Sequence, residues 1–215
     1  MSRLRYTISR PVDPGFLSGG TYQYGSYSLG ASTGIIAAAL GANSELFQFR
    51  WVDTSRVAII NAIKLSAAVS TTYFAAGVPL TLDLVKATGW TVAGTGGTGV
   101  TPAATLKKRT LFASTLVAAG DVRVATTGAL GAGTKTLEGN SMNAIMAGAP
   151  ITASLSGQIF PAGTSLLEAN VADGEWPLVL AANEGFVIRG VQTPGTGTWS
   201  ATFSIDWTEV SAYPY

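Results

Sequence analysis

Apolar and polar residues alternate along the C-terminal part of the chain. The apolar positions are Trp199, Ala201, Phe203, Ile205 and Trp207, and serine, threonine or aspartate occupies each position between them. A period of two places alternate side chains on opposite faces of a strand. This is the strongest periodic signal in the chain, and it predicts a long strand with one buried apolar face.

Similar alternation predicts further strands. In residues 45–53, Phe47, Phe49 and Trp51 share one face, whereas Gln48 and Arg50 share the other. Residues 57–69 carry apolar side chains at odd positions and predict one long strand, or two strands joined by a bulge. We expect other strands at 80–85, 121–127, 176–180 and 186–189, and a weaker one at 149–155.

The segments between these strands predict turns and loops. Gly- and Thr-rich composition indicates loops at 94–99 and 128–140, and turn residues lie at 183–185 and 194–197. The short apolar segment 32–40 instead predicts one or two helical turns, with Ser32 or Thr33 as the N-cap and Gly41 as the end.

Short strands, Gly/Thr-rich turns and few helical patterns predict an all-β fold. We expect an antiparallel β-sandwich of about eight strands, jelly-roll-like in topology. Residues 1–30 contain Pro11, Pro14 and several glycines that prevent long regular elements. The expected organisation is therefore an extended N-terminal arm, residues 1–30, followed by a single β-sandwich domain, residues 31–215.

The arm and one basic run supply the candidate contact residues. Tyrosines in a Gly/Ser-rich segment either pack on their own domain or contact a neighbouring subunit, since tyrosine is enriched at interfaces. The basic run either contacts an acidic neighbour or keeps a strand edge soluble. The candidates are Arg3, Arg5, Tyr6, Tyr22, Tyr24 and Tyr27 in the arm, and Lys107, Lys108 and Arg109 in the run.

Composition excludes several kinds of chemistry. The 215 residues include no histidine and no cysteine, which removes disulfides, Cys/His zinc sites, cysteine nucleophiles and His-based triads. A net charge of +1 gives no electrostatic footprint for nucleic acid. The best apolar run, residues 35–40, is too short to span a membrane, and the N-terminus has no apolar signal segment. We therefore expect neither direct nucleic-acid binding nor membrane association.

No motif in the sequence predicts an enzyme, a cofactor site or a metal site. Gly94, Gly96 and Gly99 have dinucleotide-motif spacing, but no helical pattern follows them, so we interpret them as a loop. The closest carboxylate pairs are Asp173 with Glu175, in a predicted turn, and Asp206 with Glu209, which alternation places on opposite faces.

Several segments resemble a family of structural proteins of tailed bacteriophages. They are the strand at residues 45–51 with the apolar strand from Val57, residues 75–78 leading into 80–85, and the ending from Pro177 to Glu209. Together they cover most of residues 29–210 in order. The resemblance implies a non-enzymatic virion component, best placed on the capsid exterior as a decoration or cement protein. Such proteins resemble β-sandwiches assembled as trimers, so the implied partners are further copies of the chain and the major capsid protein.

We expect synthesis in the host cytoplasm. That compartment is reducing, so a particle assembled there gains little from cysteine. The alternative is a carbohydrate-binding jelly roll on the virion surface, which exposed aromatics such as Trp90 or Trp176 would support. A glycosidase with two carboxylates is the least favoured hypothesis, because the acids are scattered.

Overall fold

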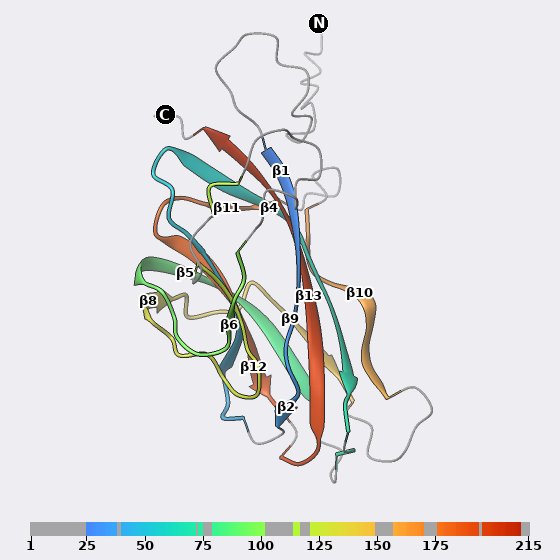
Figure 1. The fold of residues 1–215 in the computed structure, drawn as a ribbon. Coiled ribbons are helices and arrows are strands. Elements are labelled where there is room, and N and C mark those ends of the chain that lie inside the picture. The colour runs from blue at the N-terminus through green and yellow to red at the C-terminus, as the bar shows by residue number, and fades with distance from the viewer. Residues whose placement is uncertain are drawn as a thin grey trace, which may run out of the picture.

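The computed structural model describes residues 25–37, 40–71, 73–74, 79–101, 114–116, 121–148, 157–169, 176–193 and 195–211. These residues form two antiparallel β-sheets packed face to face and contain no helix (Figure 1). The predicted fold class, an all-β antiparallel sandwich, is confirmed. The candidate residues at positions 3–24 and 107–109 lie outside the described ranges.

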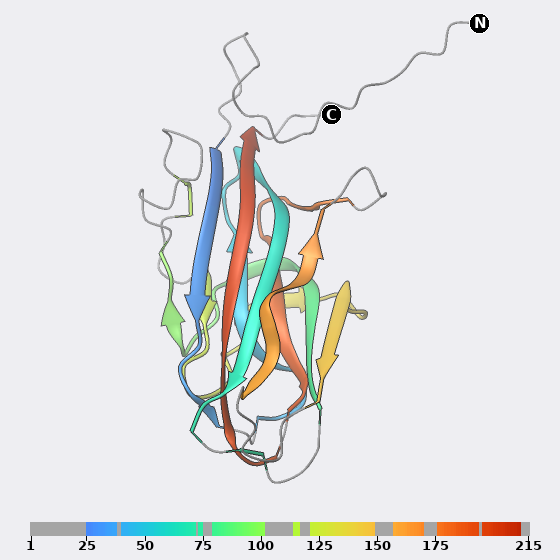
Figure 2. The ribbon, with the colours of Figure 1, turned by 90° about the vertical axis from the view of Figure 1, so that its right-hand side faces the viewer.

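The first sheet has the order β1-β13-β4-β10, and Figure 2 shows these four strands side by side. Two short strands extend it, since β2 pairs with β13 and β11 pairs with β4. Its strands are β1 Gly25–Ser32, β2 Ile36–Ala37, β4 Arg56–Val69, β10 Gln158–Glu168, β11 Leu178–Leu180 and β13 Thr198–Ser211.

The second sheet has the order β6-β7-β3-β12-β5-β8, and β9 also pairs with β5. Its strands are β3 Ser44–Trp51, β5 Leu80–Val92, β6 Thr98–Gly99, β7 Val122–Val124, β8 Thr134–Leu137, β9 Asn143–Ala147 and β12 Glu184–Gln192. The predicted strands at 45–53, 80–85, 121–127 and 186–189 all correspond to strands of this sheet.

The core confirms the alternation of the last strand. All five apolar residues of the pattern in β13 are at most 2% exposed. They face the aromatic side chains of β3, and the rings of Phe203 and Phe47 lie 5.3 Å apart between the sheets. Burial of such aromatic rings removes a large apolar area from water and is the main source of stability in a sandwich.

Strand β4 contains a bulge at Asn61. Ala58 and Ile60 face the core before it, and Ile63 and Leu65 face the core after it. The pairing with β13 shifts at the same point, because successive β13 residues pair with Ala62 and then with Ile60. One extra residue reverses the alternation. The bulged alternative for residues 57–69 is therefore the observed one, and a single face for all odd positions is wrong.

Three local predictions were wrong. Residues 32–40 contain no helical turn in their described part, because Ser32 ends β1 and residues 36–37 form β2. The expected loop at 128–140 contains β8, and the loop at 94–99 contains the two residues of β6. Strands β9 and β10 were not predicted at all, and the weak strand expected at 149–155 lies outside the described residues.

Candidate functional site

Tyr27 is the one candidate contact residue that the structure describes, and it lies in the core. Its side chain is 1% exposed, and its ring stacks on that of Trp207. Residues 25–30, which the sequence assigned to the arm, form most of β1 and pair with β13 along their length. Tyr27 therefore packs on its own domain, which is the first of the two alternatives for these tyrosines.

The surroundings of Tyr27 perturb its hydroxyl. Burial and, to a smaller extent, the nearby carboxylate of Glu209 raise the pKa of Tyr27 to about 12, and Arg56 acts in the opposite direction. Loss of the phenolic proton is costly here because the resulting anion would be buried beside another anion.

Glu209 is the centre of a buried polar cluster at this end of the sandwich. Its side chain is fully buried and accepts hydrogen bonds from Arg56 Nη1 at 3.1 Å, Ser114 Oγ at 2.6 Å and Trp207 Nε1 at 3.2 Å. The backbone and hydroxyl of Thr115 also donate to it, at 3.2 and 3.3 Å. These bonds fix segment 114–116 against the end of β13, so we assign the cluster a structural role.

The two carboxylates of β13 do not form an acid–base pair. Glu209 points into the core, whereas Asp206 lies on the outer face of the strand and is half-buried. The other candidate pair, Asp173 with Glu175, lies outside the described residues. Within the described part of the chain, no group of three or more acidic residues is placed to hold a metal ion.

Basic side chains are paired within the described part of the molecule. Every lysine and arginine in the described ranges except Arg123 forms an ion pair, and Arg123 donates to the carbonyl oxygen of Gly96. The pairs are Arg50–Asp121 at 3.0 Å, Arg56–Glu209 at 3.1 Å, Lys64–Glu168 at 3.4 Å, Lys86–Glu184 at 3.1 Å, Lys135–Glu45 at 2.8 Å and Arg189–Asp83 at 2.6 Å. The described surface therefore presents little uncompensated positive charge.

Burial shifts the pKa of the carboxyl group in one of these pairs. Burial raises the pKa of the Asp121 carboxyl above its ordinary value, and Arg50 offsets part of that effect. Asp121 Oδ2 has no hydrogen-bond partner among the described residues. The pair fixes the start of β7 against β3.

The outer face of the first sheet carries small neutral side chains. Hydroxyl groups dominate the part formed by β1 and β13, where the charged residue is the half-buried Asp206, and Lys64 of β4 is paired with Glu168. Interfaces between subunits are depleted in charged residues at their centres, so this face has the chemistry of a contact surface. The residues are Ser26, Ser28, Gly30 and Ser32 of β1, Ser66 and Ala68 of β4, and Ser200, Thr202 and Ser204 of β13.

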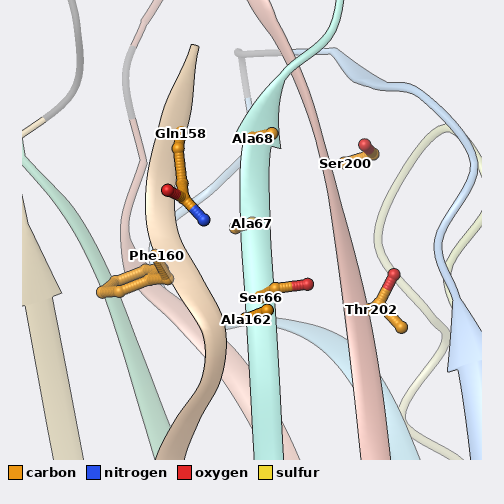
Figure 3. Close-up of a pocket in the computed structure, with 8 residues that line it drawn as sticks. All are labelled: Ser66, Ala67, Ala68, Gln158, Phe160, Ala162, Ser200 and Thr202. Carbon is orange, nitrogen blue, oxygen red and sulfur yellow. The ribbon is translucent and has the colours of Figure 1, made fainter. Parts of the chain in front are cut away.

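An open groove of about 400 Å³ crosses this face where β10 diverges from β4. The register shifts between Phe160 and Thr164, so the residues between them have no regular partner on β4. Figure 3 shows the amide of Gln158 extending toward β4 and the hydroxyls of Ser66 and Thr202 on the same face. The lining residues are Ser66, Ala67, Ala68, Gln158, Phe160, Ala162, Ser200 and Thr202.

The groove offers hydroxyl and amide groups and no charge. It therefore suits neutral polar partners, such as peptide groups or sugar hydroxyls, better than ionic ones. Sequence reasoning missed it because its residues come from three strands distant in the chain, and β10 gave no strand signal.

The two tryptophans proposed for sugar stacking, Trp90 and Trp176, differ in their exposure to solvent. Trp90 is 1% exposed and packs on the outer side of the second sheet, so it offers no free ring. Trp176 is 68% exposed beside β11, where Val179 is also exposed.

No described helix is long and apolar enough to cross a membrane. No family model, curated protein or solved structure matches this chain.

Proposed function

We propose that this chain is a non-enzymatic structural protein of a tailed-bacteriophage virion, a decoration or cement protein on the capsid exterior. The observation that carries the proposal is the hydroxyl-rich outer face of the first sheet, whose Lys64 is paired with Glu168. Such a face is suited to close packing between subunits and not to electrostatic capture of a ligand. The segments that resemble phage structural proteins support the same interpretation.

Strand pairing supports a jelly-roll topology. Eight main strands are β1, β3, β4, β5, β9, β10, β12 and β13, and the first pairs with the last. Moving inward, β3 pairs with β12, β4 with β10 and β5 with β9. This is the pairing expected when one long hairpin rolls into two sheets. Jelly rolls occur in viral capsid proteins and in lectins, which is a fold-level analogy for both candidate functions.

The proposed partners are further copies of the chain, as a homotrimer, and the major capsid protein. Residues 1–24 and the run Lys107–Lys108–Arg109 are the candidate capsid contacts, since six of the thirteen basic residues lie there. Because β1 begins at Gly25, a truncation that tests the arm must end at residue 24 and leave β1 intact.

Cosedimentation with capsids that lack this protein tests the proposal. Full-length protein is expected to sediment with the capsids, whereas protein lacking residues 1–24 stays in the supernatant with its melting temperature nearly unchanged. The control replaces Lys107, Lys108 and Arg109 with serine, which separates the arm from the basic run. Absence of binding by the full-length protein would contradict a decoration role.

Light scattering tests self-association separately. A trimer gives about three times the chain mass of 22.0 kDa, and a monomeric mass at micromolar concentration would contradict the homotrimer.

The second candidate is a carbohydrate-binding jelly roll on the virion surface. The neutral polar groove and the exposed ring of Trp176 are the observations that favour it. A glycan array distinguishes the two functions, because a cement protein gives no saturable binding. If binding is seen, its loss in Gln158→Ala places the sugar in the groove, and its loss in Trp176→Ala places the sugar beside β11.

A further inference from the structure

An amine, a carboxylate and an amide meet in a buried site on the outer side of the second sheet. Lys135 Nζ of β8 lies 2.8 Å from Glu45 Oε2, and Gln48 Nε2 of β3 lies 2.6 Å from the same oxygen. The two nitrogen atoms are therefore no farther apart than the sum of these distances. The triad brings together residues distant in the sequence and belongs to no site described above.

The site is closed to solvent. The side chains of Lys135 and Glu45 are 2% and 8% exposed, and Gln48 is fully buried. The ring of Trp90 covers the amine, with Nζ 4.5 Å from its centroid. Gly94 packs so tightly against the amide that a Cβ there would lie 2.1 Å from Gln48 Oε1.

The amide is held in a way that a purely stabilising role does not explain. Gln48 Nε2 also donates to the carbonyl oxygen of Gly131 at 3.0 Å, and Lys135 Nζ also donates to that of Ala132. Gln48 Oε1, in contrast, has no hydrogen-bond partner among the described residues. Buried polar atoms are almost always paired, and an unpaired one calls for an explanation, such as strain, an ordered water or a chemical role.

Transamidation transfers the acyl group of glutamine to the lysine amine and releases ammonia. The reaction needs these three groups and little water. The amine must lose a proton to become a nucleophile, and the leaving nitrogen must gain one. A carboxylate that contacts both nitrogens can do both, and dry surroundings suppress competing hydrolysis. We propose that Lys135 and Gln48 form an intramolecular isopeptide bond, with Glu45 as the proton carrier.

The step balances without an oxidant or a co-reactant. Glu45 takes a proton from the Lys135 ammonium, and Nζ attacks Gln48 Cδ to form a new C–N bond. The Cδ–Nε2 bond then breaks as Glu45 returns the first proton to Nε2. Glu45 next passes on the second proton, which the attacking nitrogen releases, so that Nε2 departs as an ammonium ion and Glu45 is again a carboxylate. Each chain reacts once, so the step requires no turnover and is independent of the proposed function.

The bond would join β8 to β3 across the two strands that separate them in the sheet, β12 and β5. The bond would fix β8 covalently to the outer side of the second sheet, in a chain that has no cysteine for a disulfide. Lys86 offers an internal comparison, because it pairs with Glu184 at 3.1 Å on another part of the same sheet.

Intact-mass spectrometry of the full-length protein tests the proposal. The expected mass is below the sequence mass by one ammonia, and digestion is expected to yield one branched peptide joining Gln48 to Lys135. An unmodified mass for the folded protein overturns the proposal without recourse to any variant. Loss of ammonia at another position, such as a cyclised asparagine, also overturns it.

Variants assign the roles within the triad. Lys135→Arg keeps the positive charge but cannot form the amide, and Glu45→Gln removes the proton carrier, so both are expected to keep the full sequence mass. The matched control Lys86→Arg is expected to retain the loss of ammonia. A branched peptide in Glu45→Gln would overturn the role of Glu45, and far-ultraviolet circular dichroism checks that each variant is folded.

Discussion

The ring of Tyr27 stacks on the ring of Trp207, with centroids 5.4 Å apart and planes inclined by 26°. The two residues are direct partners in the register between β1 and β13. The first and last strands of the described chain therefore join through an aromatic contact as well as through backbone hydrogen bonds. This contact makes β1 part of the sandwich core and sets the end of any removable arm before Gly25.

Replacement of Trp207 by alanine is expected to lower the free energy of unfolding by about 3–5 kcal/mol. The ring is fully buried, meets the edge of Phe49 at 5.6 Å and donates its Nε1 hydrogen to Glu209. Denaturant titration measures the loss, with Trp176→Ala as the control. Because Trp176 is 68% exposed, the control is expected to change stability by only about 0.5 kcal/mol. A loss below about 1 kcal/mol in Trp207→Ala would contradict the buried position.

The sequence predicts the long core strands well, because an unbroken alternation of apolar and polar residues corresponds to one buried face of a strand. In β13 that face is unbroken for five apolar positions. Strand β10 gave no such signal, because Pro161 and Gly163 interrupt it and its pairing with β4 shifts three times. Gly163 has a φ of +80°, which breaks the extended pattern. Register shifts change the face that each residue presents, so alternation fails even though a strand forms.

The buried polar residues of β3 show a second limit of sequence reasoning. Alternation places Gln48 and Arg50 opposite the aromatic face, and this assignment is correct. Alternation does not reveal that Gln48 is fully buried, because segments distant in the sequence cover it. Contacts with Gly94 and Gly131 supply that cover. The groove on the first sheet was unpredictable for the same reason, since it depends on how three strands are placed in space.

Replacement of Gly185 by alanine is expected to destabilise the protein by about 1–3 kcal/mol through overpacking. A Cβ there would lie 2.2 Å from the backbone oxygen of Phe49 and 2.8 Å from the ring of Trp90, and neither group moves easily. The control is Gly30→Ala in β1, where a Cβ meets no atom within 4 Å. That control is expected to be neutral or to stabilise by up to about 1 kcal/mol, because glycine weakens a strand. Thermal melting measures the stability of both variants. Equal shifts in melting temperature would contradict the close approach at Gly185.

Replacement of Glu209 by alanine is expected to cost about 3–5 kcal/mol, because it leaves Arg56 without its buried partner. The substitution also removes the acceptor for Ser114, Thr115 and the Trp207 indole. Glu168→Ala is the control, since it breaks the exposed Lys64 pair, whose side chains are 41% and 56% exposed. The control is expected to cost no more than about 1 kcal/mol. Chemical denaturation that ranks the two variants in the opposite order would refute the structural role of the Glu209 cluster.

Alkaline pH is expected to destabilise the protein through Tyr27. Its pKa is about 12 in the folded protein and 10.0 for an ordinary tyrosine, so the folded state retains a proton that the unfolded state loses first. The resulting stabilisation is fully present below pH 10 and is lost as the pH rises toward 12, by up to about 2–3 kcal/mol. Tyr27→Phe keeps the ring that stacks on Trp207 but has no hydroxyl to ionise. Unfolding free energies measured at intervals across this range are therefore expected to fall more steeply for the wild type than for Tyr27→Phe. All other ionisable groups are the same in both proteins, so the difference between the two curves isolates Tyr27. Parallel curves would show that its hydroxyl ionises as freely in the folded chain as in the unfolded one.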